Sequence, residues 1–222
     1  GSASNVVPDH CEARLLIDGR EKCITASGKA SHASTPEDGE NAIAALAEKL
    51  ASPLPQSPFV RFYRDRIGSS LHGELMGCAL ADIESGKLTM NVGTIGVTDG
   101  SLVMEIDVRA PVTFEADAVT EPLRRAAAEY GIEVTLTQDT PPVYMDKNGA
   151  VIQKLLAVYR EETGDFSEPT VIGGGTYARA MDNIVAFGPM FPGRELTEQL
   201  EASMGWSRST TLTLLRRMVG KG

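Results

Sequence analysis

The segment LTMNVGTIGVTDGSLVMEIDVRAP, residues 88–111, decides the fold class. Two apolar-rich runs flank the sequence TDG at 98–100, which is typical of a tight turn between antiparallel strands. Along the second run, residues of the two chemical classes alternate: Val103, Glu105, Asp107 and Arg109 share one face, and Met104, Ile106 and Val108 share the other. This alternation predicts an antiparallel sheet with one covered face.

The sequence on both sides of this segment completes a small α+β unit. We expect strands at 11–17 and 21–28 joined around Asp18-Gly19-Arg20, helices at 38–51, 59–67 and 113–130, and a strand at 132–137. From residue 21 the order is strand, helix, two hairpin strands, helix, strand. That order predicts a ferredoxin-like domain, an antiparallel sheet with two helices on one face.

A second region begins near Pro141. A helix is predicted over 148–163, with Val151, Leu155 and Val158 facing inward. Short strands are predicted at 169–172, leading into GGGT at 173–176, and at 184–187, and the tail from 195 to 219 has a weakly helical pattern. The first four residues, GSAS, resemble an expression scar and are left out of the predicted fold.

Composition excludes several classes of function. The 222 residues are 42% hydrophobic and carry a formal net charge of −9, which argues against surfaces for nucleic acid or anionic membranes. No apolar run approaches the ~20 residues that span a bilayer. Three cysteines without metal-site spacing are most simply reduced thiols of a cytoplasmic protein. Only three histidines are present, so few metal sites are possible.

The sequence GKASHASTPEDGENAI at 28–43 carries a histidine, His32, on a loop just ahead of a helix. Thr35 is the expected cap and Pro36 suits a first helical turn. His32 is either a positioned polar group or an ordinary surface or capping histidine, and the loop alone favours the second. A serine hydrolase built on Ser31 or Ser34 is disfavoured, because adjacent residues rarely pair as nucleophile and base and no G-x-S-x-G motif is present.

Two further features could bind an anion. The glycines of GGGT let backbone N–H groups approach a small anion such as a carboxylate, although a plain tight turn explains them equally well. Arg109, on the polar face of its strand, is suited to a bidentate carboxylate clamp, although a solvated arginine is the commoner case. Asp9 and His10 are neighbours without a third ligand in view, so no zinc site is predicted from these residues.

Four segments, in order along the chain, carry a resemblance to a known family. They are NVVPDHCEA (5–13), GKASHASTPEDGENAI (28–43), IDVRAP (106–111) and GGGTYARAMDNIVAFGPMFPG (173–193). Together they resemble the PepV-like dipeptidases, zinc metallopeptidases of the aminoacylase and carboxypeptidase G group. The resemblance implies a ferredoxin-like lid domain, a dipeptide substrate with a free C-terminal carboxylate, and two zinc ions in the parent enzyme.

The resemblance also implies roles for individual residues. It makes His32 the lid histidine that stabilises the oxyanion, and Asn5 an asparagine that assists substrate binding. Arg109 would hold the substrate's C-terminal carboxylate, and Gly174, Gly175 and Thr176 would line the same pocket.

Departures from the family pattern suggest an incomplete enzyme. Most of the family's zinc ligands come before the segment that matches 5–13: a His-x-Asp motif, a bridging aspartate, a Glu-Glu pair and a further acidic ligand. These are absent here. Gln199 stands about where a last histidine ligand is expected. We therefore expect a remnant at 1–20, a lid domain at 21–140 and an incomplete α/β catalytic segment at 141–222, with no zinc bound by this chain. A homodimerising or substrate-binding module, and a dipeptidase whose other half is a separate polypeptide, are the alternatives.

Overall fold

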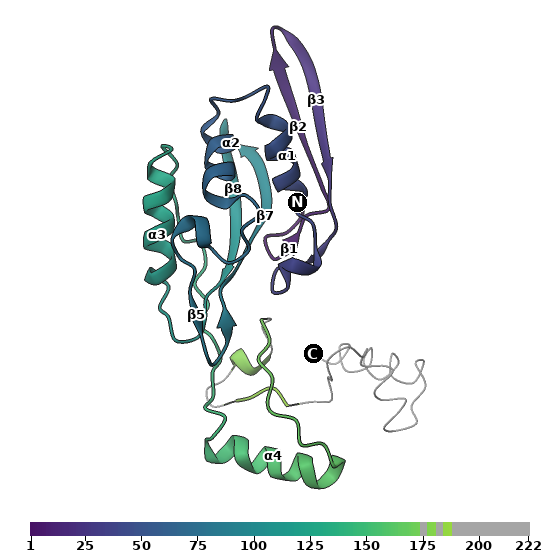
Figure 1. Ribbon diagram of the computed structural model, residues 1–222, viewed down its shortest axis with the longest axis vertical. Helices are drawn as coiled ribbons and strands as arrows, with labels where there is room; N and C mark the ends of the chain where they lie inside the picture. The colour runs from purple at the N-terminus through teal and green to yellow at the C-terminus, as the bar shows by residue number, and fades with distance from the viewer. Residues whose placement is uncertain (174–176, 181–183, 188–222) are drawn as a thin grey trace, which may run out of the picture. The chain divides into compact units, whose positions relative to one another are not determined.

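The computed structural model describes residues 1–173, 177–180 and 184–187 (Figure 1). The chain divides into two compact units, Gly1–Gly175 and Thr176–Gly222, and each is described by itself. In the second unit the described residues include a short 3-10 helix, η4 (Tyr177–Ala180). The hairpins and the α-helices all lie in the first unit.

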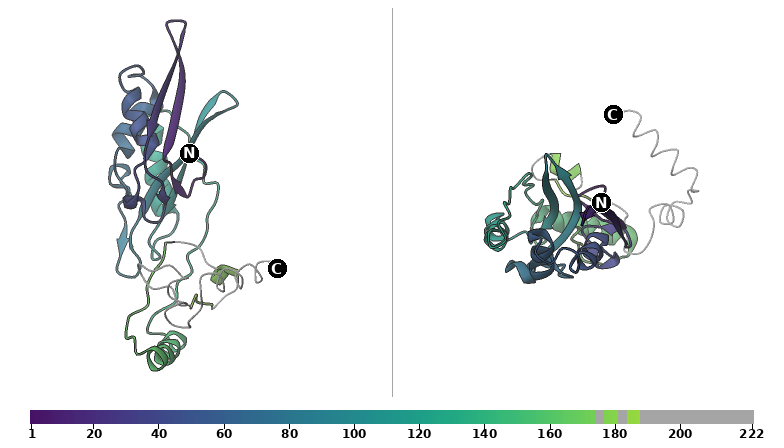
Figure 2. Two further views of the ribbon diagram at one scale, coloured as in Figure 1. Left: turned by 90° about the vertical axis from the view of Figure 1, so that its right-hand side faces the viewer. Right: turned by 90° about the horizontal axis from the view of Figure 1, so that it is seen from above.

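Two antiparallel hairpins form the framework of this unit. The predicted pairs are confirmed as β2 (His10–Ile17) with β3 (Arg20–Ser27), and β7 (Thr89–Thr98) with β8 (Ser101–Arg109). Both turns consist of an Asp-Gly pair with positive φ at each residue, the geometry that matches the twist of the strands: Asp18 (51°), Gly19 (73°), Asp99 (50°) and Gly100 (78°). Figure 2 shows the two hairpins as separate twisted ribbons.

Helices cover the hairpins. The three predicted helices are confirmed as α1 (Ala42–Leu50), α2 (Pro58–Phe62) and α3 (Asp117–Ala128). The 3-10 turn η1 (Pro36–Asp38) precedes α1, and α2 continues into the π-helical η2 (Tyr63–Ile67). Thr35 makes no capping hydrogen bond through its side chain, so that prediction was wrong. Asn41 caps α1 instead, because its side-chain oxygen accepts from two amides of the first turn.

One apolar core unites these elements. Side chains of α1, α2, β7 and α3 contribute its buried centre, among them Ile43, Phe62, Met90 and Leu123, together with Leu88 just ahead of β7. The predicted inward face of β8 is confirmed, since its apolar residues Met104, Ile106 and Val108 pack against this core.

Short strands complete the described pairings. β1 (Val6–Val7) pairs with β4 (Ser31–His32), and β5 (Ala81–Asp82) pairs with β6 (Gly86–Lys87), so the described residues form four two-stranded sheets. No strand forms at 132–137. Ile132 and Val134 still pack against the core, but the segment forms no backbone hydrogen bonds with a partner strand. Residues 169–172 and 184–187 also lack the predicted strands. The ferredoxin-like arrangement stays a prediction.

The helix predicted over 148–163 is confirmed as α4 (Ala150–Thr163). Its buried residues are Ile152 and Leu156, whereas Val151 and Val158 are 55% and 57% exposed, so the predicted inward stripe was wrong at those two positions. Apolar residues lie on more than one side of this helix, and the sequence pattern alone could not select the covered side.

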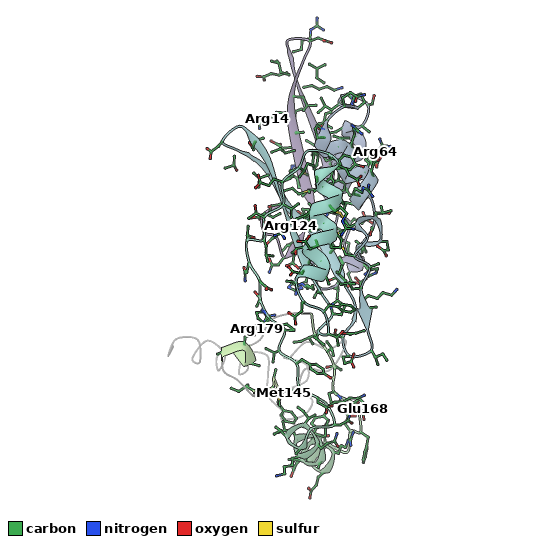
Figure 3. All side chains as sticks on the ribbon, turned by 90° about the vertical axis from the view of Figure 1, so that its left-hand side faces the viewer. Arg14, Arg64, Arg124, Met145, Glu168 and Arg179 are labelled. Atoms are coloured by element: carbon green, nitrogen blue, oxygen red, sulfur yellow. The ribbon has the colours of Figure 1, made fainter. Side chains whose placement is uncertain are left out.

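Charged side chains lie on the outside of the described elements. Figure 3 shows Arg14 on β2, Arg64 on η2 and Arg124 on α3. Each forms an ion pair with an exposed glutamate, and such solvated pairs contribute little to stability. Within the described part of the chain, no helix has the length and apolar character needed to cross a membrane.

Candidate functional site

His32 is held at the start of a tight loop. It ends β4, where it pairs with Val6 of β1. The next residue, Ala33, donates its amide to the carbonyl of Asn5 at 3.0 Å, and the amide of Thr35 closes a turn onto the His32 carbonyl at 3.0 Å. The backbone of His32 is therefore fixed from both sides, while its side chain remains exposed.

Close backbone packing anchors this loop to the beginning of α1. Lys29 and Glu40 exchange two backbone hydrogen bonds of 2.9 Å. A Cβ atom on Gly28 would lie 2.0 Å from the Glu40 carbonyl oxygen, and one on Gly39 would lie 2.5 Å from the Ser31 hydroxyl. A side chain at either position would clash with the neighbouring backbone, so both approaches require glycine.

The imidazole of His32 has a defined proton position. Its Nδ1 lies 2.7 Å from the Ser34 hydroxyl and accepts the Ser34 backbone amide at 3.2 Å. Because a backbone amide can only donate, Nδ1 carries no proton in this geometry, and the neutral ring carries its proton on Nε2. No described residue forms a hydrogen bond with Nε2, so this N–H is available to a ligand.

The backbone of Asn5 contacts the loop that carries His32. Its carbonyl accepts from Ala33, and its side chain is exposed. The predicted pair of site residues is therefore brought together by the β1–β4 bridge.

A buried amide, which the sequence did not reveal, supports this bridge. Asn91 of β7 is 3% exposed, and its Nδ2 donates to the carbonyls of Ser4 at 3.1 Å and Val6 at 3.0 Å. Its Oδ1 accepts from Nδ2 of Asn41 at 3.1 Å. Excluding residues 1–4 from the fold was thus wrong for Ser4.

Asn41 links the same network to the helix. Its Oδ1 accepts from the amides of Ile43 and Ala44, while its Nδ2 also donates to the Val92 carbonyl at 2.8 Å. The start of α1, strand β7 and the N-terminal segment therefore meet at two asparagine side chains. Because every hydrogen bond is buried or half-buried, the network fixes the geometry of its neighbours.

Arg109 does not stand free in solvent. Its Nε donates to Oδ1 of Asp107 at 2.9 Å and its Nη2 donates to Oδ2 at 3.2 Å, with both side chains half-buried. Its Nη1 donates to the carbonyl of Gly173. The two residues are two positions apart on one strand, so the alternation in the sequence was the signal that could have predicted this ion pair.

Gly173 brings the predicted features together. A Cβ atom on it would lie 2.6 Å from Cβ of Ser34, the serine that contacts His32. The first glycine of GGGT therefore lies against the His32 loop and accepts from Arg109. The other predicted pocket residues, Gly174, Gly175 and Thr176, lie outside the described residues, as does Gln199.

Zinc does not fit the described residues. Among them, no group of three or more His, Cys, Asp or Glu side chains converges as a metal site would require. The three cysteines are free, and burial raises the pKa of the Cys11 and Cys78 thiols, which disfavours the thiolate that binds metal. The absence of zinc from this chain stays a prediction.

Comparison with known proteins gives the site its context. No family model matches the chain. Three proteins of Staphylococcus aureus, from strains USA300, NCTC 8325 and COL, are each 35% identical over 225 aligned residues and bear the name "Putative dipeptidase". Each alignment covers 88% of this chain and 48% of the relative, so the chain spans about half the length of the curated relatives it matches. The chain is similar to about half of a staphylococcal protein named as a dipeptidase.

Proposed function

We propose that this chain is part of a metal-dependent dipeptidase that hydrolyses dipeptides with a free C-terminal carboxylate. Its contribution is to stabilise the oxyanion and to bind the carboxylate, and it lacks most of the zinc ligands. The observation that carries the proposal is the arrangement of His32, whose Nδ1 is occupied by Ser34 and whose Nε2–H is left as a donor.

An oxyanion donor must offer its hydrogen before charge develops on the substrate. A neutral imidazole with its proton on Nε2 meets this need, provided that the ring does not turn or exchange its proton. The His32 backbone is fixed by the β1–β4 pair and by the Thr35 turn, so the donor is held in place before substrate arrives.

Arg109 retains the capacity to bind a carboxylate. A guanidinium has five N–H donors, of which Nε and one each on Nη1 and Nη2 are used by Asp107 and Gly173. One hydrogen remains on each terminal nitrogen, and each can donate to a carboxylate oxygen. Asp107 holds the guanidinium plane, so little side-chain entropy is lost on binding.

The described residues do not fit zinc, so the proposed contribution ends at these two functions. In a zinc dipeptidase the metal would activate the attacking water. No step through the metal is assigned to this chain.

The test is hydrolysis of dipeptides by the longer protein that contains this segment. Replacing His32 with Ala should lower kcat by ~10²–10³ with a smaller change in KM, because the lost interaction forms in the transition state. His10→Ala, which removes another exposed histidine, is the matched control and should stay near the original rate. A His32→Ala protein with normal turnover would contradict the proposal.

One observation favours a second candidate, a non-catalytic dimerisation module. Exposed apolar residues cluster at the far end of the β7–β8 hairpin, where Val97 (73% exposed) pairs with Leu102 (49%). Exposed strand edges of this kind can pair with a second copy. Light scattering separates the candidates. A dimer that dissociates when Val97 and Leu102 are replaced by charged residues would favour the module, whereas a monomer would count against it.

A further inference from the structure

Asn91 and Asp107 form a cross-strand pair in the β7–β8 hairpin. They are Cα partners in the ladder, and residues directly opposite one another project from the same face of a sheet. Asn91 supports the β1–β4 pair that carries His32. Arg109 lies two positions after Asp107 on β8, so it shares this face. The partner of Asn91 is therefore placed to support the second functional side chain of the site.

We propose that Asp107 is a positioning residue that orients the Arg109 guanidinium for a ligand carboxylate. Nε and Nη2 of Arg109 donate to the two different oxygens of Asp107 at 2.9 Å and 3.2 Å, so the contact is a planar fork. Such a fork fixes the plane of the guanidinium, whereas a single hydrogen bond would let it turn. The inference deepens the proposed function and rests on it only for what Arg109 binds.

The fork distinguishes this ion pair from the others. Within the described part of the chain, each of the other five ion pairs is joined by one hydrogen bond at most. The side chains of Arg109 and Asp107 are 22% and 18% exposed, less than the side chains of the other five pairs. Solvent screens a half-buried pair less than an exposed one, so this pair holds its geometry more firmly.

A third contact completes the restraint on Arg109. Its Nη1 donates to the Gly173 carbonyl, so Nε and both terminal nitrogens each use one hydrogen. Turning the guanidinium away from Asp107 would break the fork, and the two hydrogens that are left over are presented from a fixed plane. The donor is therefore oriented before a ligand arrives, which lowers the ordering cost of binding.

The charge of Asp107 gives the test its direction. Asp107 is itself a carboxylate, so its negative charge opposes a second carboxylate bound to Arg109. If charge alone governed the site, removing that charge would tighten binding. If Asp107 orients the guanidinium, removing one of its acceptor oxygens weakens binding instead. The two roles therefore predict opposite changes in the KM of a dipeptide.

Hydrolysis of dipeptides by the longer protein that contains this segment measures this change. Asp107→Asn keeps the side-chain volume but loses the charge and one acceptor oxygen, and its amide hydrogens would face those of Nη2. We expect KM to rise roughly threefold to tenfold, with kcat changed by less than about twofold. In an Arg109→Ala background, Asp107→Asn should leave KM unchanged, because the effect passes through the guanidinium. A lower or unchanged KM in Asp107→Asn, or the same rise in the Arg109→Ala background, would overturn the inference.

A second measurement uses the chain itself and requires no activity. Proton–nitrogen spectra recorded at mildly acidic pH report how fast each arginine Nε–H exchanges with water. The Arg109 Nε–H is bonded to Asp107, whereas Arg124 pairs through Nη1 and not through Nε. We expect the Arg109 hydrogen to exchange roughly tenfold more slowly than that of Arg124, and Asp107→Ala to remove the difference. Glu121→Ala, which breaks the Arg124 ion pair, is the matched control and should leave Arg109 exchange as it is.

The two measurements separate this inference from the proposed function. If Arg109→Ala leaves KM unchanged while Asp107 protects the Arg109 Nε–H, the positioning contact stands and the carboxylate role of Arg109 fails. If Arg109→Ala raises KM while its Nε–H in the unmodified chain exchanges as fast as that of Arg124, the carboxylate role stands and positioning by Asp107 fails.

Discussion

Replacing Asn91 with Ala should destabilise the chain and loosen the His32 loop together. The side chain is buried and makes three hydrogen bonds, to Ser4, Val6 and Asn41. At about 1 kcal/mol for each bond, the free energy of unfolding should fall by about 3 kcal/mol. Urea denaturation followed by circular dichroism measures this loss.

Two companion variants separate the hydrogen bonds from the packing. Asn91→Asp has the same shape but presents an acceptor in place of the amide donor, so it should lose at least as much stability although it leaves no cavity. Asn148→Ala removes an exposed asparagine and should change stability by no more than about 0.5 kcal/mol.

The effect on the site is read from amide exchange. The Ala33 amide donates to Asn5, in the segment that Asn91 holds, so its exchange should accelerate in Asn91→Ala at a temperature where the chain stays folded. A stability loss below about 1 kcal/mol, or unchanged protection of Ala33, would refute the claim that the buried amide supports the site.

Two further substitutions test backbone packing and pH dependence. Gly28→Ala should lower the free energy of unfolding by about 1–3 kcal/mol, because the added Cβ would meet the Glu40 carbonyl. Gly96→Ala has open space around it and should be nearly neutral. Thermal denaturation measures both variants, and equal losses would contradict this. Burial alone would raise the pKa of Asp82, but hydrogen bonds led by those from Ser85 lower it from 3.8 to about 2. The folded state therefore gains stability from the ionised carboxylate above pH 3.8. The difference in free energy of unfolding between the unmodified chain and Asp82→Asn should shrink as pH falls toward 2. A difference that is constant down to pH 2 would contradict this.

Local patterns were sufficient to predict the hairpins and most helices. The Asp-Gly turns and the alternation around Glu105 and Asp107 are properties of neighbouring residues, and the structure reproduces both hairpins. The strand expected at 132–137 failed because a ladder requires a partner strand, which local periodicity cannot supply. The covered side of α4 was missed for a related reason, since it depends on what the helix packs against.

The candidate site was predictable only in part. His32 and Arg109 were identified through the resemblance, and the structure connects them through Ser34 and Gly173. Asn91 gave no signal, because between Met90 and Val92 it reads as an outward polar residue. Its partners lie 50 to 87 positions away in the sequence, beyond the reach of periodicity or capping rules.

The distance that hides the Asn91 network from the sequence also sets when the site can form during synthesis. The carbonyls of Ser4 and Val6 leave the ribosome 87 and 85 residues before the amide that binds them. At ~5–20 residues per second this is a delay of roughly 4–17 s. The two hairpins need only neighbouring strands and can close as they emerge, whereas the hydrogen bonds that support the β1–β4 pair must wait for Asn91. The residues around His32 are thus made well before the buried amide that supports them.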